Sequence, residues 1–187
     1  MKSSVFERGD RRSDATFRAP VTIRVGARFQ AGTERVFNAW IRPEVARRWL
    51  FATAARPIAH VEIDARAGGA FRFVERRAKG AAEYRGKYVE IVPHRRVAFS
   101  LELVDRTHAH TSVVVEIERR SSGSRLVLTH DDVPHDLAYG IEARWTGMLY
   151  GLGVTLDSVG DEAFADDPPV VRRQPLRRPA LAERGAP

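Results

Sequence analysis

The chain has 187 residues, of which 43% are hydrophobic and 29% charged, a composition that fits a single globular domain with its own core. It has no cysteine, which excludes a disulfide framework and thiolate chemistry and fits a cytoplasmic location. No run approaches the roughly 18 apolar residues of a membrane span, and the charged N-terminus lacks the apolar centre of a secretory signal.

The net charge of +7 is concentrated at the two ends of the chain. Residues 1–20 hold five basic and three acidic residues, and residues 170–187 hold five basic residues and one acidic residue, so the part between them is nearly balanced. We therefore expect neither nucleic acid nor a membrane as a partner of the body. The composition predicts a flexible lead over 1–20, one domain over 21–160 and a flexible Pro/Arg-rich tail over 161–187.

The predicted elements begin with one strand and two short helices. Residues 21–29 alternate between polar and apolar as a strand does. Thr33 is placed to cap a helix that runs to Trp40, and Pro43 suits the first position of a second helix that ends near Trp49. Strand-like runs with short separators follow, at 58–65, 70–76, 83–92, 96–104, 111–119 and 124–130.

A long helix of roughly 25 residues is predicted to open at Pro134, with Asp131 or Asp132 as its cap. Its large apolar side chains form one stripe, and three glycines lie among them: Trp145, Leu149, Leu152 and Leu156, with Gly147, Gly151 and Gly153. Because glycine inside a helix costs about 1 kcal/mol against alanine, we expect a close approach to this helix. The sheet, a ligand or the helix of a second copy could make that approach.

This order of elements predicts an α+β fold in which the last helix covers one face of an antiparallel sheet. Alternation indicates which strand residues face the helix, among them Val61 and Ile63, Phe71 and Phe73, Tyr84 and Tyr88, Phe99, and Leu126, Leu128 and His130. A curved sheet around one helix tends to leave a cavity between them, which suits a small apolar ligand.

Several motifs, in the same order, resemble a known family. They are Val36-Phe37-Asn38-Ala39-Trp40 with Pro43-Glu44 and Arg48-Trp49, Gly68-Gly69-Ala70-Phe71-Arg72-Phe73, the run from Tyr84 to Pro93, Leu126-Val127-Leu128-Thr129-His130, and the stripe of the last helix. Together they resemble the START/Bet v-like (SRPBCC) superfamily, and within it the prokaryotic family named after the activator of heat shock protein 90 ATPase. The glycine that this family has before the helix tryptophan is Arg144 here, and Gly147 and Gly151 are additions to the pattern.

The resemblance implies a helix-grip fold: a seven-stranded curved antiparallel sheet wrapped around a long C-terminal helix, with two short helices after the first strand. It also implies a cavity for a small, largely hydrophobic or aromatic molecule between sheet and helix. We expect the ligand to contact Trp40, Trp49, Phe71, Phe73, Tyr84, Tyr88, Phe99, Leu128, His130, Trp145, Leu149 and Leu152. His130, Tyr84 or Arg72 would orient it, and we expect no cofactor, no metal and no catalytic residue.

Two other functions stay open. A cyclase- or aromatase-like enzyme would use acid/base groups in the same cavity. A His130 paired with an inward carboxylate, both open to the cavity, would favour it, and a closed or purely apolar interior would count against it. Otherwise His130 is a hydrogen-bonded structural histidine, and Glu83 and Glu90 are expected at the surface. A co-chaperone-like domain is implied by the family name alone and predicts an exposed apolar patch. A homodimer is a further option.

Other polar clusters have simpler explanations. The stretch from His130 to His135 holds metal-ligand residue types, but helix capping explains its aspartates. His108 and His110 are expected to be exposed, and His60, Glu62 and Asp64 to form a solvated strand face.

Overall fold

The computed structural model describes residues 18–53, 56–78, 80–103, 109–160 and 164. The predicted flexible lead lies outside these residues except at its last three positions, and the predicted tail lies outside them except at Phe164; His108 also lies outside them. Within the described ranges, no helix is both long enough and apolar enough to cross a membrane.

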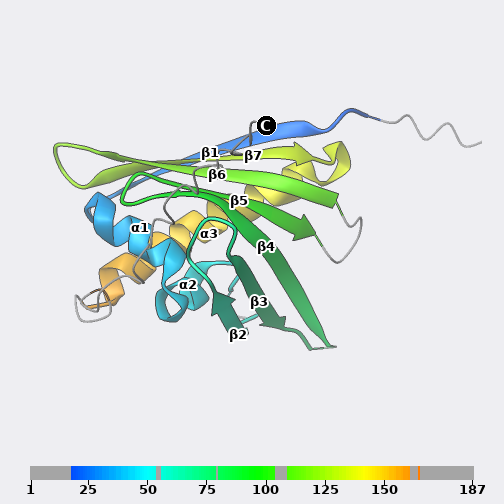
Figure 1. The fold of residues 1–187 in the computed structure, drawn as a ribbon, viewed down its shortest axis with the longest axis horizontal. Helices are drawn as coiled ribbons and strands as arrows, with labels where there is room; N and C mark the ends of the chain where they lie inside the picture. Colours follow the sequence, from blue (N-terminus) through cyan, green and yellow to red (C-terminus); the bar gives the residue numbers. More distant parts are fainter. Residues whose placement is uncertain (1–17, 54–55, 79, 104–108, 161–163, 165–187) are drawn as a thin grey trace, which may run out of the picture.

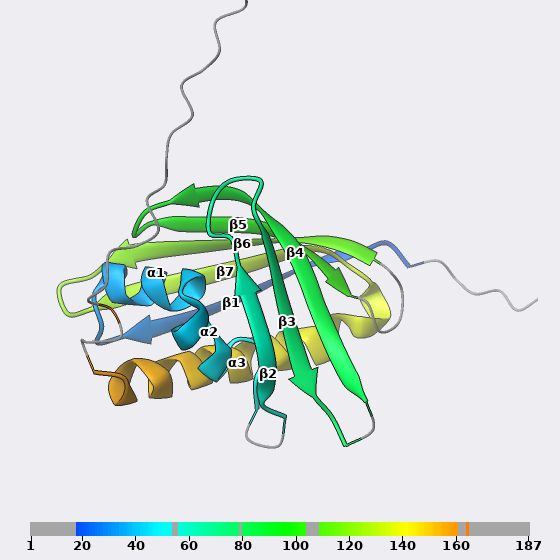
Figure 2. The same cartoon turned by 60° about the horizontal axis from the view of Figure 1, so that its bottom comes forward.

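The described chain forms one seven-stranded antiparallel sheet and three α-helices, in the predicted order. The strands pair in the order β1-β7-β6-β5-β4-β3-β2. Figures 1 and 2 show the sheet curving around α3, with α1 and α2 on the same side of the sheet. The elements are β1 Val21–Phe29, α1 Thr33–Ile41, α2 Pro43–Trp49, β2 Ile58–Ile63, β3 Ala70–Arg76, β4 Ala81–Val92, β5 Arg96–Leu103, β6 Ala109–Arg119, β7 Ser124–Val133 and α3 Ala138–Ser158.

The predicted start of α2 at Pro43 is confirmed, but the predicted starts of α1 and α3 are wrong in detail. Asp131 and Asp132 lie inside β7, because Val133 still pairs with Val21 and the Asp131 carboxylate accepts a hydrogen bond of 2.6 Å from Thr22. A short 3-10 turn, His135–Leu137, then precedes α3, whose N-cap is Leu137. The cap of α1 is Gly32, and Thr33 is already helical.

The core lies between the concave face of the sheet and the helices. The inward residues predicted on β3, β4, β5 and β7 are buried, and Leu126 and Leu128 are fully so, whereas Val61 and Ile63 on the edge strand β2 are only partly buried. The three tryptophans connect the three helices. The Trp40 ring contacts the Trp49 ring edge-on, with 4.7 Å between centroids, and its centroid lies 6.4 Å from that of Trp145. Large buried aromatic side chains dominate the stability of such a core.

Glycines occupy two different kinds of position. A Cβ atom on Gly86 would lie 1.9 Å from the Ser100 carbonyl oxygen and 2.3 Å from the Phe71 ring, so only glycine fits there. In α3 no described part of the chain makes the expected close approach: a Cβ on Gly147 would meet nothing within 4 Å among the described atoms, and on Gly151 and Gly153 the nearest contacts are an ordinary 3.8 Å to Trp49 and 3.7 Å to Phe29.

We predict opposite effects for the same substitution at these two sites. Gly147→Ala should raise the free energy of unfolding by about 0.5–1 kcal/mol, because it removes backbone entropy from the unfolded chain and adds a helix former in open space. Gly86→Ala should lower it by at least about 2 kcal/mol, because Phe71 or strand β5 must move. Urea titrations of both variants beside the parent protein measure this; a destabilised Gly147→Ala variant would show that the space above α3 is filled.

Candidate functional site

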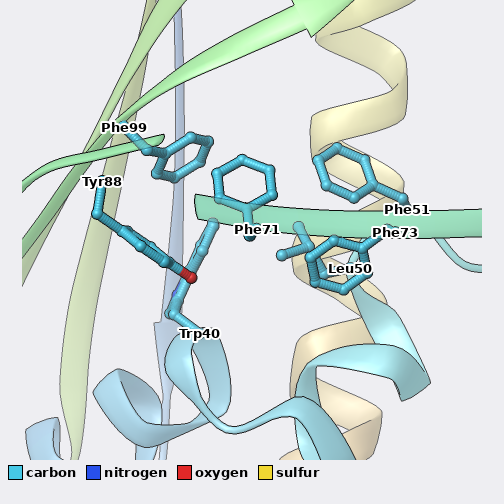
Figure 3. A pocket seen from close by; sticks show the side chains of 7 residues that line it. All are labelled: Trp40, Leu50, Phe51, Phe71, Phe73, Tyr88 and Phe99. Carbon is cyan, nitrogen blue, oxygen red and sulfur yellow. The ribbon is translucent and has the colours of Figure 1, made fainter. Parts of the chain in front are cut away.

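Two small spaces lie among the core side chains, and Phe51 lines both. The first is about 10 Å³, enough for one water molecule at most. Its walls come from α1, β3, β4, β5 and the connection after α2 (Figure 3). They are almost entirely apolar and consist of Trp40, Leu50, Phe51, Phe71, Phe73, Tyr88 and Phe99.

The second space is about 30 Å³ and lies between the sheet and the first half of α3. Unlike the first, it combines apolar walls with charged and polar groups. It is lined by Phe51, Tyr84, Leu101, His130, Ile141, Arg144, Trp145 and Met148. Phe51 is the one residue common to the two linings.

Eight of the residues predicted to contact a ligand line these spaces. Trp40, Phe71, Phe73, Tyr88 and Phe99 line the first, and Tyr84, His130 and Trp145 line the second. The other four lie elsewhere in the core. Leu149 lines a groove between α3 and β1, whereas Trp49, Leu128 and Leu152 are packed among core side chains.

His130 is held inside the core by a chain of hydrogen bonds. The Trp145 indole N–H donates to His130 Nδ1 at 2.9 Å, and His130 Nε2 lies 2.7 Å from the Thr111 hydroxyl. Because an indole nitrogen can only donate, Nδ1 is the acceptor and the proton sits on Nε2. Thr111 then donates to the Leu101 carbonyl oxygen at 3.0 Å. This relay ties α3 to β5, β6 and β7.

The surroundings of His130 keep its imidazole neutral. The side chain is fully buried, and this burial lowers its pKa to about 4, against a smaller opposite effect of Asp131. Both ring nitrogens are engaged with uncharged partners. Neither of these partners is the inward carboxylate that would favour an acid/base role for His130.

A buried carboxylate, that of Glu75, is connected to the second space through the Tyr84 hydroxyl. Glu75 is 1% exposed and accepts a hydrogen bond of 2.7 Å from the Tyr84 hydroxyl. Arg77 and Arg56 lie 3.3 and 3.8 Å from the same carboxylate. Arg144 donates to the Tyr84 oxygen at 2.5 Å, and its guanidinium carbon lies 5.4 Å from the centre of that ring.

Burial raises the pKa of Tyr84, and the opposing effect of Arg144 does not reverse this. The phenol therefore stays protonated near neutral pH and can donate to Glu75. The result is a chain of polar groups, Arg144–Tyr84–Glu75, at one end of an aromatic cavity. A ligand with a polar group could be oriented there.

Sequence reasoning missed Glu75 although a signal was present. The residue continues the inward alternation of Phe71 and Phe73 along β3. By the same alternation Arg72 lies on the outer face, where it pairs with Glu83, so it is not an orienting group of the cavity. Two arginines, Arg85 first and Arg72 second, hold the pKa of Glu83 at about 2. Glu90 is exposed, as expected.

Phe51 is unusual in its backbone. Its φ is +59°, in the left-handed region, where a bulky residue costs about 1–3 kcal/mol. The ring is 4% exposed, and burial of a phenylalanine side chain contributes about 1.5–3 kcal/mol, which offsets this strain. Phe51 also stacks face to face on Tyr84, with 4.3 Å between centroids and 4° between planes.

Other candidate clusters are at the surface. His60 and Glu62 form an exposed pair, and His110 is exposed on β6. In the part of the chain that the structure describes, no three His, Cys, Asp or Glu side chains converge as metal ligands would. The groove between α3 and β1, about 550 Å³, is bordered by the exposed side chains of Tyr150 and Val154.

Comparison with known proteins agrees with this fold. The family model "Activator of Hsp90 ATPase homolog 1-like protein" matches residues 30–157. A crystal structure of a Chromobacterium violaceum protein is 23% identical, covers 74% of this chain and 98% of its own, and has a TM-score of 0.68. A solution structure of an AHSA1-like protein from Aeromonas hydrophila is 19% identical, with 74% and 93% covered and a TM-score of 0.65. A search of curated proteins found no match. These findings confirm the predicted family and helix-grip fold.

We predict that the Tyr84 hydroxyl stabilises the protein through Glu75. Tyr84→Phe should lower the free energy of unfolding by about 1.5–3 kcal/mol, because a buried carboxylate loses a donor. Tyr88→Phe is the matched control on the same strand, since the described residues supply no hydrogen-bond partner for that hydroxyl; it should change stability by less than about 0.5 kcal/mol. Equal effects of the two changes in urea unfolding would contradict the role of Glu75.

The buried neutral histidine predicts a loss of stability in acid. The pKa of His130 is about 4 in the folded protein and near 6.5 in the unfolded chain. The contribution of His130 to the free energy of unfolding is full above pH 6.5. It declines as the pH falls towards 4, since only the unfolded chain then takes up the proton. Between pH 7.5 and 4.5 this amounts to about 2–3 kcal/mol.

The test compares unfolding of His130→Gln with that of the parent protein at both pH values. Glutamine can accept from Trp145 and donate to Thr111 without titrating. The fall in the free energy of unfolding between pH 7.5 and 4.5 should therefore be about 2–3 kcal/mol smaller in this variant than in the parent protein. His110→Gln, which removes an exposed histidine, should leave it unchanged. An undiminished acid loss in His130→Gln would rule out His130 as its source.

Proposed function

Because the chain belongs to the Activator of Hsp90 ATPase homolog 1-like family, whose SRPBCC fold generally binds hydrophobic ligands, we propose that it binds one small, largely hydrophobic or aromatic molecule between the sheet and α3. The observation that supports this most is the pair of small spaces inside the curve of the sheet, both lined mainly by aromatic side chains, with Phe51 in both linings.

The polar groups of the cavity support binding of a molecule that is not a plain hydrocarbon. Arg144, Tyr84 and Glu75 form a connected chain at one end, and every other wall is apolar apart from the satisfied His130. Such a combination of apolar walls with a few converging polar groups is typical of small-molecule sites. Burial of apolar ligand surface would supply about 25 cal/mol per Å² of affinity before the costs of association.

The alternative functions have weaker support. The enzyme would be favoured by a carboxylate beside His130, but His130 is bonded to Trp145 and Thr111. The co-chaperone requires an apolar patch, for which Tyr150 and Val154 beside the α3–β1 groove are the described candidates. The cytoplasmic location, the homodimer and the domain boundaries stay predictions.

We predict that naphthalene and 1-naphthol bind between the sheet and α3 and quench tryptophan fluorescence, because Trp145 lines the second space. Since about 30 Å³ is smaller than either molecule, binding requires side chains of the lining to move. At a concentration of 100 times the dissociation constant, a bound probe should stabilise the fold by about 2.7 kcal/mol, measured by thermal unfolding. Failure of every such probe to bind at its solubility limit would count against a cavity for apolar ligands.

Two variants on α3 locate the probe. Ile141→Trp fills the second space and should weaken binding at least about tenfold, a loss of roughly 1.4 kcal/mol. Val154→Trp fills the outer groove and should leave binding unchanged. The reverse pattern would move the site to the groove between α3 and β1.

A further inference from the structure

We propose that the Phe51 ring occupies the place of the ligand's own ring, and that the ligand is a planar aromatic carboxylate. Its ring would replace that of Phe51 against Tyr84, and its carboxylate would pair with Arg144. This inference rests on the proposed binding function and names the chemical class of molecule that the same cavity takes.

The slot around Phe51 has the shape of a site for a flat ring. Tyr84 covers one face in parallel at 4.3 Å, Phe73 presents an edge at 5.3 Å and 73°, and Trp145 is tilted at 6.1 Å. Stacked and edge-on contacts of this kind favour planar aromatic groups over branched aliphatic ones. The spaces beside the ring extend the slot beyond one ring, and an engineered apolar cavity of about 150 Å³ already takes up benzene.

The backbone at Phe51 favours release of the ring. The other described non-glycine residues with positive φ are His94 and Asp132, residue types that tolerate this conformation, whereas phenylalanine does not. Phe51 lies in the connection between α2 and β2, and its N–H donates only to the sulfur of Met148, at 3.2 Å. A thioether is a weak acceptor, so an outward movement breaks no strand or helix hydrogen bond.

Arg144 gives the slot its preference for an anion. It donates to the Tyr84 oxygen, and the planar guanidinium has further N–H donors for a carboxylate in bidentate geometry. The charge that would oppose an anion is that of Glu75, which lies behind the Tyr84 hydroxyl and is already paired with Arg77 and Arg56. No other Asp or Glu lines the described part of this space.

The test measures binding of 2-naphthoate to the full chain by calorimetry. If the ligand must displace Phe51, only the small fraction of parent molecules in which the slot is vacant can bind it. The apparent affinity of the parent protein is then the intrinsic affinity multiplied by that fraction. Phe51→Ala should therefore bind at least tenfold more tightly. The matched control is Phe37→Ala, another buried phenylalanine, which lines neither space; its affinity should stay within threefold of the parent's.

The role of Arg144 is tested with a neutral analogue. Arg144→Gln should weaken 2-naphthoate at least fivefold and 2-naphthamide less than twofold, because only the anion gains from the guanidinium. In case Phe51→Ala fails to fold, NMR of the parent protein gives an independent measurement. Saturating naphthoate should replace the Phe51–Tyr84 ring contacts by naphthoate–Tyr84 contacts.

The outcomes separate this inference from the proposed function. If 2-naphthoate and naphthalene bind no variant, the binding function itself fails. If they bind the parent and Phe51→Ala alike, or if Phe51 keeps its contacts with Tyr84 in the complex, the cavity binds ligands but Phe51 does not stand in for them. If Arg144→Gln weakens the binding of 2-naphthamide as much as that of 2-naphthoate, the preference for an anion is overturned.

Discussion

The relay from Trp145 through His130 and Thr111 to Leu101 is the interaction on which the arrangement of helix and sheet depends. It is buried in apolar surroundings, where a donor or acceptor without a hydrogen bond is costly. The Trp145 N–H, both ring nitrogens of His130 and the Thr111 hydroxyl all have hydrogen-bond partners. Contacts between apolar side chains are non-directional, so they specify the position of α3 on the sheet less sharply than hydrogen bonds do. The donors and acceptors of the relay meet in one register only, and the relay therefore fixes the position of α3 against β5, β6 and β7.

The rest of the interior follows from this anchoring. With Trp145 held by His130, its ring forms the floor on which Phe51 rests, and Phe51 in turn stacks on Tyr84. Tyr84 is positioned from the other side by its hydrogen bond to Glu75. The aromatic side chains therefore have defined planes and distances, whereas a core held by apolar contact alone could pack in several ways. A slot with fixed walls can discriminate between flat and branched ligands.

Much of the fold could be predicted from the sequence, because strand alternation and helical period leave the apolar face of each element visible. The inward Phe71 and Phe73 and the stripe that begins at Trp145 are confirmed as core. The same rules locate the missed polar groups: Glu75 is two residues after Phe73, and Arg144 lies three residues after Ile141, on the edge of the stripe. Phe51 could not be predicted, since it lies in a connection without a period, and tertiary contacts alone set its positive φ.

Arg144 and the glycines of α3 are the places where the helix departs from the family pattern, and their consequences differ. Gly147 faces open space and only lowers helix stability, so it adds nothing that the described contacts require. Arg144 replaces a glycine at the mouth of the second space, where it covers the Tyr84 ring and bonds its hydroxyl. A glycine there would leave the space wider and neutral. The arginine makes it narrower and cationic, which is the basis on which we propose an anionic ligand.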